Sequence, residues 1–79
     1  MEPNIELISF SKAIEALKLG VKVARQGWNG KNMYVELQNP TELSKMTRPY
    51  LFMKTADEQL VPWLASQTDL LAEDWFLIA

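Results

Sequence analysis

Two short segments carry the side chains best suited to hold a ligand. The first, Gly27-Trp28-Asn29-Gly30-Lys31, places a tryptophan in a predicted turn, where its flat face could stack on a nucleotide base. Asn29 and Lys31 could contact polar groups, and a glycine on each side lets a ligand approach the backbone. Alternatively, Trp28 folds back over the sheet as a lid on the core. The spacing favours neither interpretation.

The second segment runs from Trp63 to Asp69 and ends in four polar residues, Ser66-Gln67-Thr68-Asp69, at a predicted helix start. Exposed backbone N–H groups at a helix start suit a phosphate or a ribose hydroxyl. The carboxylate of Asp69 favours a sugar hydroxyl or a base N–H over a bare anion. The alternative places Trp63 in the core and gives Thr68 and Asp69 a role in capping the helix. For Thr68 and Asp69 taken individually, capping is the better interpretation.

The charged residues offer two further candidates. Asp69, Glu73 and Asp74 form a close acidic cluster, in which two carboxylates at i, i+4 spacing could bind a divalent ion. The preferred interpretation is a solvated helix face with acids near its N-terminus. Three cations are the best placed to meet a phosphate, although each is more often a solvated charge: Arg25, Arg48 and Lys54.

The composition excludes several kinds of chemistry. The 79 residues include no His and no Cys, which excludes a histidine general base, a cysteine nucleophile, a zinc finger and a disulfide framework. No Gly-rich phosphate-binding loop occurs either. A Ser–Lys or carboxylate scheme is still open for catalysis. We expect no enzyme activity, no cofactor and no metal ion, and the family resemblance described below is the main reason. A net charge of −2 argues against a nucleic-acid polymer as partner, because gripping its backbone requires a basic surplus.

Length and hydropathy predict one domain over residues 1–79. No apolar run approaches the roughly 18 residues needed to span a bilayer. The first residues also lack the basic start and apolar block of a signal peptide. We therefore expect a soluble, cytoplasmic protein with no membrane partner. Three Trp, three Phe and two Tyr are many aromatics for so short a chain, which predicts that some lie at a subunit interface or in a ligand pocket.

Hydrophobic periodicity predicts the elements of the first half. Phe10, Ala13, Ile14 and Leu17 form one apolar stripe, which predicts a helix over residues 11–19. Ser9 or Ser11 can cap its N-terminus, and Gly20 suits its C-terminal end. Alternation predicts strands over residues 21–25 and 33–38, paired as a hairpin.

The second half is predicted in the same way. Residues 40–49 are polar and read as a loop with room for one helical turn. Strands follow over residues 50–54 and 60–64, and Pro62 confines the latter to a sheet edge. A short helix over residues 70–74, preceded by capping-box residues Ser66 and Asp69, leads to a last strand over residues 75–78. The predicted fold class is α+β: a small antiparallel β-sheet with an N-terminal helix and a short C-terminal helix.

These segments together resemble a known family. The helix over residues 11–20, the stretch Lys22-Val23-Ala24-Arg25-Gln26-Gly27-Trp28-Asn29-Gly30-Lys31, the strand and turn over residues 49–57, and the long block over residues 60–75 occur in the same order. They are similar to the small phage and prophage proteins of the second Thoeris anti-defence type, formerly a domain of unknown function. The resemblance covers residues 9–78, and its final block is long and specific.

The resemblance implies a function. Such proteins bind and sequester glycocyclic ADP-ribose, a cyclic ADP-ribose signal made by a bacterial TIR-domain sensor, without cleaving it. This blocks Thoeris immunity in the infected bacterial host. Some relatives also hold cyclic oligonucleotides of a CBASS-type defence at separate sites. The family forms homo-oligomers, expected to be homotetramers, with ligand pockets between subunits.

The resemblance also implies contacts. Stacking would come from Phe10, Trp28 and Trp63, and polar or close backbone contacts from Asn29, Gly30, Gln67, Thr68 and Asp69. Two departures stand out. Glu58-Gln59 occupies a turn where relatives commonly have Gly, and the loop between Gln38 and Pro49 is short compared with longer relatives. If that loop lines an additional ligand site, the resemblance no longer implies binding of cyclic oligonucleotides here. Without the resemblance, the residues indicate only a small α+β binding module. A module that covers a host protein and a metal-dependent nucleotide hydrolase using Asp69, Glu73 or Asp74 are the alternatives.

Overall fold

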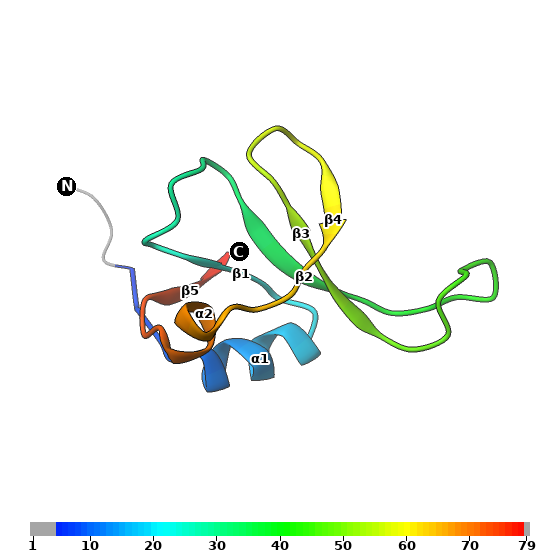
Figure 1. Cartoon of the computed structure of the whole chain (residues 1–79). Coiled ribbons are helices and arrows are strands. Elements are labelled where there is room, and N and C mark those ends of the chain that lie inside the picture. The colour runs from blue at the N-terminus through cyan, green and yellow to red at the C-terminus, as the bar shows by residue number, and fades with distance from the viewer. Residues whose placement is uncertain (1–4, 79) are drawn as a thin grey trace.

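A five-stranded antiparallel sheet with the spatial order β4-β3-β2-β1-β5 forms the frame of the protein (Figure 1). The computed structural model describes residues 5–78. Its helices are α1 (Phe10–Lys18) and α2 (Gln67–Leu71), and its strands are β1 (Lys22–Arg25), β2 (Tyr34–Gln38), β3 (Tyr50–Lys54), β4 (Leu60–Pro62) and β5 (Trp75–Ile78). This arrangement confirms the predicted α+β class. Neither helix is long or apolar enough to cross a membrane.

The N-terminal helix forms where its apolar stripe predicts, one residue earlier than expected. Ser9 is its cap, because the Ser9 hydroxyl accepts a hydrogen bond from the Lys12 N–H at 3.4 Å. Ser11 instead lies inside the helix. Gly20 follows the last turn with a φ of +90°, a conformation that glycine adopts without a steric penalty. The predicted start and stop residues therefore act as expected.

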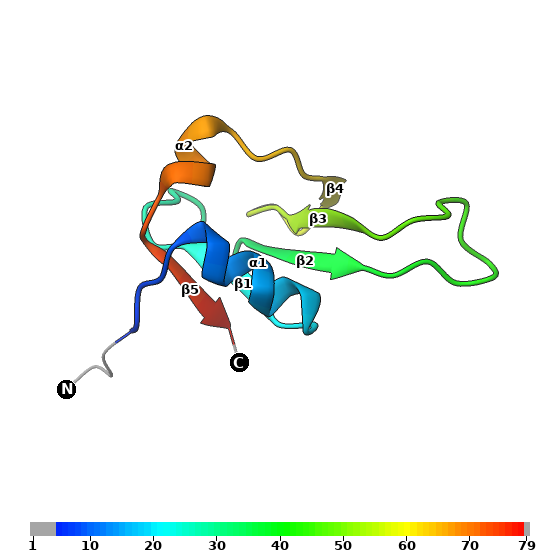
Figure 2. The same cartoon turned by 90° about the horizontal axis from the view of Figure 1, so that it is seen from below.

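The core lies between α1 and one face of the sheet (Figure 2). Val23 of β1 is directly opposite Val35 of β2, and both side chains are fully buried together with Leu17 of α1. Because side chains alternate across a strand, these valines fix which face of the sheet meets the helix. The buried hydrophobic side chains of the described chain are Ala13, Ala16, Leu17, Val23, Ala24, Val35 and Trp75.

The elements of the second half differ from the prediction at their ends. The strand predicted over residues 60–64 ends at Pro62, and β4 is an edge strand, as the proline requires. The helix predicted over residues 70–74 is wrong by three residues. Ser66 and Asp69 form the expected capping box, and this places the first helical residue at 67.

Residues 39–49, called the arm below, extend away from the body of the protein (Figure 1). The arm has no helical turn, so that expectation was wrong; a pair of hydrogen bonds between Thr41 and Ser44 shapes it instead.

In the turn between β3 and β4, Glu58 adopts a φ of +69°. This is a backbone conformation that glycine adopts more easily than other residues. The Glu58 side chain forms an ion pair with Lys54 at 3.1 Å.

Two leucines at the end of α1 provide a matched test of this core. Leu17 is 0% exposed and Leu19 is 83% exposed. We expect Leu17→Ala to lower the free energy of unfolding by about 2–5 kcal/mol, since it leaves a cavity under Val23 and Val35. Leu19→Ala should change it by about 0.5 kcal/mol or less. Urea unfolding followed by tryptophan fluorescence measures both, and equal losses would contradict this placement of the core.

Candidate ligand-binding face

Trp75, the first residue of β5, lies at the centre of an aromatic cluster. Its side chain is fully buried. The ring centroids of Phe10, Trp28 and Trp63 lie 5.3, 5.4 and 5.9 Å from that of Trp75, and both tryptophans meet it edge-on. Phe10 and Trp63 are themselves 6.2 Å apart. The structure therefore brings together the three aromatic residues to which the family resemblance assigned base stacking.

The three outer rings of this cluster are only half buried, because one side packs on Trp75 and the other reaches the surface. Trp28 thus acts in part as a lid on the core and still presents an accessible surface. Trp63 likewise belongs to the margin of the core. Sequence reasoning missed Trp75 as the support of this group, since it lies in a continuous apolar run that does not distinguish a core residue from a site residue.

An ion triad of Arg25, Asp69 and Asp74 borders the cluster. Arg25 Nη1 donates to Asp69 Oδ1 and Arg25 Nε donates to Asp74 Oδ1, each at 2.9 Å. The backbone N–H of Gly27 donates to the second oxygen of Asp74, Oδ2, at 2.8 Å. These bonds tie the turn that carries Trp28 to α2 and to the segment before β5.

The triad keeps both carboxylates ionised. Partial burial raises the pKa of Asp69, but hydrogen bonds from the Ser66 N–H, Arg25 and the Ser66 hydroxyl outweigh it and lower the pKa overall. The Asp74 pKa is lowered chiefly by its hydrogen bond from Arg25. The pKa of Arg25 is raised, first of all by its hydrogen bond to Asp74. Each partner therefore stabilises the charged form of the others.

These contacts correct two predictions. The acidic cluster is not a solvated helix face, because Asp69 and Asp74 share Arg25; only Glu73 is exposed. Arg25 is neither solvated nor free for a phosphate. The described residues also contain no group of three or more acids that could hold a metal ion.

The predicted polar contacts lie around the cluster at the surface. Asn29 follows Trp28, and Gln67 and Thr68 lie in the first turn of α2; all three are exposed, and none makes a side-chain hydrogen bond within residues 5–78. Asp69 differs, because both of its carboxylate oxygens are already engaged. A Cβ on Gly30 would collide with Met33 and Ala56, so this glycine is required where two turns touch.

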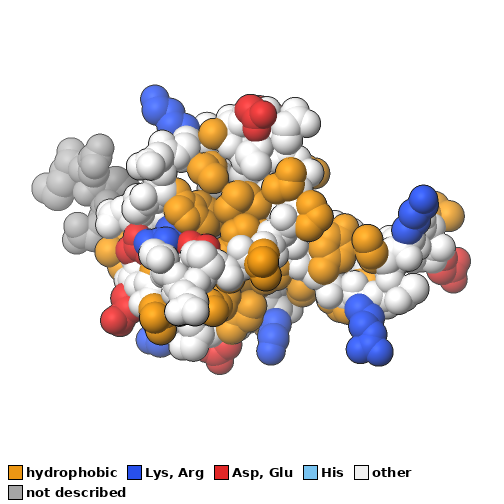
Figure 3. Space-filling model, viewed as in Figure 1, with side chains coloured by type: hydrophobic (Ala, Val, Ile, Leu, Met, Phe, Trp, Pro, Cys, Tyr) orange, Lys and Arg blue, Asp and Glu red, His pale blue; other side chains and the backbone are white. Residues whose placement is uncertain are grey.

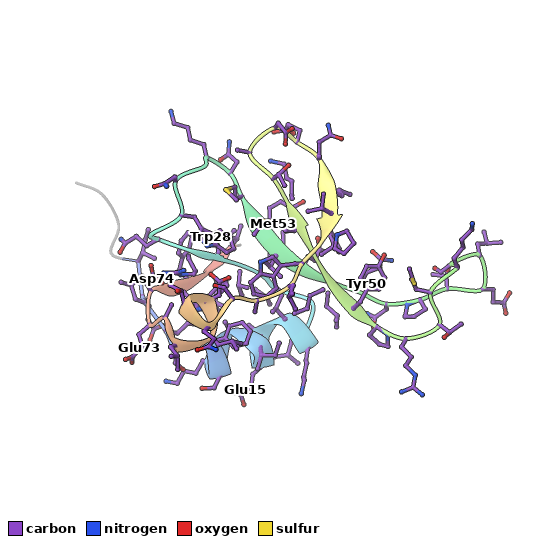
Figure 4. The ribbon with its side chains drawn as sticks, viewed as in Figure 1. Glu15, Trp28, Tyr50, Met53, Glu73 and Asp74 are labelled. Atoms are coloured by element: carbon purple, nitrogen blue, oxygen red, sulfur yellow. The ribbon has the colours of Figure 1, made fainter. Side chains whose placement is uncertain are left out.

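The face that carries the cluster is open. Hydrophobic side chains cross its middle (Figure 3), and Trp28 and Met53, both packed on the core, lie between the 26–33 turn and the β3–β4 hairpin (Figure 4). A hollow of about 400 Å³ beside this turn is lined by Trp28, Gly30 and Met33, and by residues of β1 and β5. Phe10, Trp63 and α2 do not line it. The predicted contacts are therefore spread over an open face rather than gathered in one cavity.

These features define a class of protein: a small α+β domain with an aromatic face that is bordered by an ion triad. A family model described as the Thoeris anti-defense 2-like domain matches residues 8–78. Thoeris anti-defense 2 of Bacillus phage SP01 is 40% identical over an alignment 85 positions long, which covers 91% of this chain and 96% of that relative. The chain belongs to the Thoeris anti-defense 2-like family, which confirms the resemblance seen in the sequence and makes this a phage anti-defence protein directed against Thoeris.

The ion triad predicts a pH-dependent contribution to stability. Because the pKa values of Asp69 and Asp74 are lower in the folded state, their contribution is present above the ordinary aspartate pKa of 3.8. It is lost as the pH falls below 3.8 through the folded-state pKa values. We expect Asp74→Asn to lower the free energy of unfolding at neutral pH by about 1–2 kcal/mol and to weaken this acid dependence.

Urea unfolding at a series of pH values measures both effects. Glu73→Gln is the matched control, because the neighbouring Glu73 is exposed and pairs with no cation within the described chain. If the two variants showed the same stability and the same acid dependence, the triad would not hold the fold together as described.

Proposed function

We propose that this protein binds glycocyclic ADP-ribose, the signal made by a TIR-domain sensor, and sequesters it without cleaving it. It would act in the cytoplasm of the infected bacterial host, where the Thoeris effector stays inactive because its activator is no longer free. Family membership supports the anti-defence role. The observation that carries the choice of a nucleotide is the set of half-buried rings of Phe10, Trp28 and Trp63 held on one buried tryptophan.

Stacking by itself is too weak for sequestration. Base–aromatic stacking contributes about 1–3 kcal/mol per base. A ligand with roughly 35 non-hydrogen atoms at about −0.3 kcal/mol each would bind with about −11 kcal/mol, a Kd on the order of 10 nM. We propose that Asn29, Gln67 and Thr68 supply polar contacts to ribose and phosphate, since their side chains are exposed beside the cluster. Gly30 and Asp69 would complete the contact set.

Binding without cleavage agrees with the chemistry of the acidic side chains. A general base or metal ligand must be free to take up a proton or a cation. Asp69 and Asp74 are instead held by Arg25, and their lowered pKa values make them weak bases. This supports a binding protein over the metal-dependent hydrolase considered above.

We propose further that the protein works as a homotetramer. The aromatic face is open, and a ligand held for long needs most of its surface covered. A second subunit placed against this face would supply the missing wall, as the family resemblance implies. A separate site for cyclic oligonucleotides, which the resemblance also implies, is part of the same proposal.

Calorimetry with glycocyclic ADP-ribose tests the proposal directly. We expect binding with a Kd of about 10 nM, and intact ligand in the supernatant after heat denaturation, as measured by mass spectrometry. Linear ADP-ribose is the control ligand, and a cyclic oligonucleotide titrated in the same way tests the second ligand class. Degraded ligand would establish a hydrolase. No binding, together with a stable complex with a host protein, would favour an interaction module.

Trp28 provides the test at the level of a residue. If its ring stacks on the base, Trp28→Ala should weaken binding at least about tenfold while the circular dichroism spectrum is retained. Leu43→Ala is the control, because Leu43 is 98% exposed and belongs to the arm, which extends away from the body of the protein (Figure 1). Unchanged affinity would exclude Trp28 from the site, and an unfolded variant would show that its main role is to cover the core.

A further inference from the structure

One residue from the far end of the chain, Asp74, holds the backbone that leads to Trp28. Its carboxylate accepts hydrogen bonds from Arg25 Nε and from the Gly27 N–H, at 2.9 and 2.8 Å. Its backbone carbonyl accepts from the N–H of Gln26, which lies between them, at 2.9 Å. Trp28 comes next in the chain, and its N–H donates to the Arg25 carbonyl at 3.2 Å. The three residues before Trp28 are thus all bonded to Asp74.

Gly27 allows the carboxylate of Asp74 to come this close. A Cβ on Gly27 would lie 2.9 Å from Asp74 Oδ2, which is shorter than a normal van der Waals contact. Gly27 does not adopt a positive φ, so the need for glycine comes from the nearby carboxylate and not from the backbone conformation. Gly27 and Asp74 therefore form one link, which can be broken from either side.

The ring of Trp28 depends on support from this part of the chain. It is half buried and meets Trp75 edge-on, with 5.4 Å between the ring centroids. It also lines the hollow of about 400 Å³ beside its turn, so part of its surface has no packing partner. The residues that follow it, Asn29 and Lys31, are exposed. The link to Asp74 is thus the hold on Trp28 that is closest in the sequence.

We propose that Asp74 is a positioning residue for nucleotide binding, which acts by holding Trp28 in the orientation in which its ring stacks on the base. This inference rests on the proposed function, in which Trp28 makes that contact. Asp74 would not touch the ligand, because both of its carboxylate oxygens already accept hydrogen bonds from Arg25 and Gly27. A ring that is fixed before binding loses less freedom when the ligand arrives, and affinity rises accordingly.

Two substitutions break the link from opposite sides. In Asp74→Asn the amide keeps one acceptor oxygen, which can serve Arg25 or Gly27 but not both. Calorimetry with glycocyclic ADP-ribose should show binding weakened about three- to tenfold, the cost of ordering one more side chain on binding. Gly27→Ala retains the carboxylate but displaces it, and should weaken binding by a similar factor. Far-UV circular dichroism identifies which variants are folded, and Gly27→Ala provides the test if Asp74→Asn does not fold.

Glu73→Gln is the matched control, because Glu73 is exposed and lies away from the turn that carries Trp28 (Figure 4). It should bind like the wild type. If Asp74 acts through Trp28, Asp74→Asn should weaken binding by less than about twofold in a chain that already carries Trp28→Ala. An equal loss with and without Trp28, or wild-type affinity in the folded link variants, would overturn the proposal.

A measurement without nucleotide tests the hold on Trp28 itself. In the ligand-free protein, the heteronuclear NOE of the Trp28 indole N–H should fall in Asp74→Asn and in Gly27→Ala; the spectrum of Trp28→Ala identifies this signal. The Trp63 signal should stay unchanged, since Trp63 packs on the same Trp75 but follows β4. An unchanged Trp28 signal would overturn the proposal. A wild-type chain that does not bind glycocyclic ADP-ribose would instead contradict the proposed function, so the two failures are distinguishable.

Discussion

The indole of Trp75 must be covered on every side, and the arrangement of the surrounding segments follows from how this is achieved. Phe10 of α1, Trp28 of the turn after β1 and Trp63 after β4 pack against it. Its N–H, which would be costly to bury unpaired, donates to the backbone carbonyl of Asp69 at 3.0 Å. The three rings that cover Trp75 reach the surface on their other side. A buried core residue therefore holds together the aromatic side chains of the candidate binding face.

The ion triad fixes the segments that this packing brings together. Arg25 at the end of β1 reaches both Asp69 and Asp74, and Asp74 in turn holds the backbone of the following turn through Gly27. Removing one carboxylate would leave a partly buried guanidinium short of a partner. Rigid support of this kind reduces the ordering that binding would otherwise require of Trp28 and of the first turn of α2.

Features that depend only on residues close together in the sequence could be predicted from it. The apolar stripe of α1, the Ser9 cap, the stop at Gly20 and the edge position of Pro62 follow from spacing and backbone chemistry within a few residues. The capping box was predicted as well, yet the helix was placed too late, because the periodicity of a five-residue helix is too short to fix its start. The roles of Asp74 and Arg25 could not be predicted, since they are 49 residues apart.

By itself, the sequence determined the α+β class, the family and the residue types that can meet a nucleotide, because composition, periodicity and an ordered set of motifs are properties of the chain alone. Only the tertiary structure decided which of those residues lie next to one another. Packing around Trp75 joined three aromatic residues from distant segments, and pairing with Arg25 gave Asp69 and Asp74 a structural role. Likewise, the antiparallel pairing of β1 with β5 brought Asp74 next to the turn that carries Trp28, a contact between segments that are far apart in the sequence.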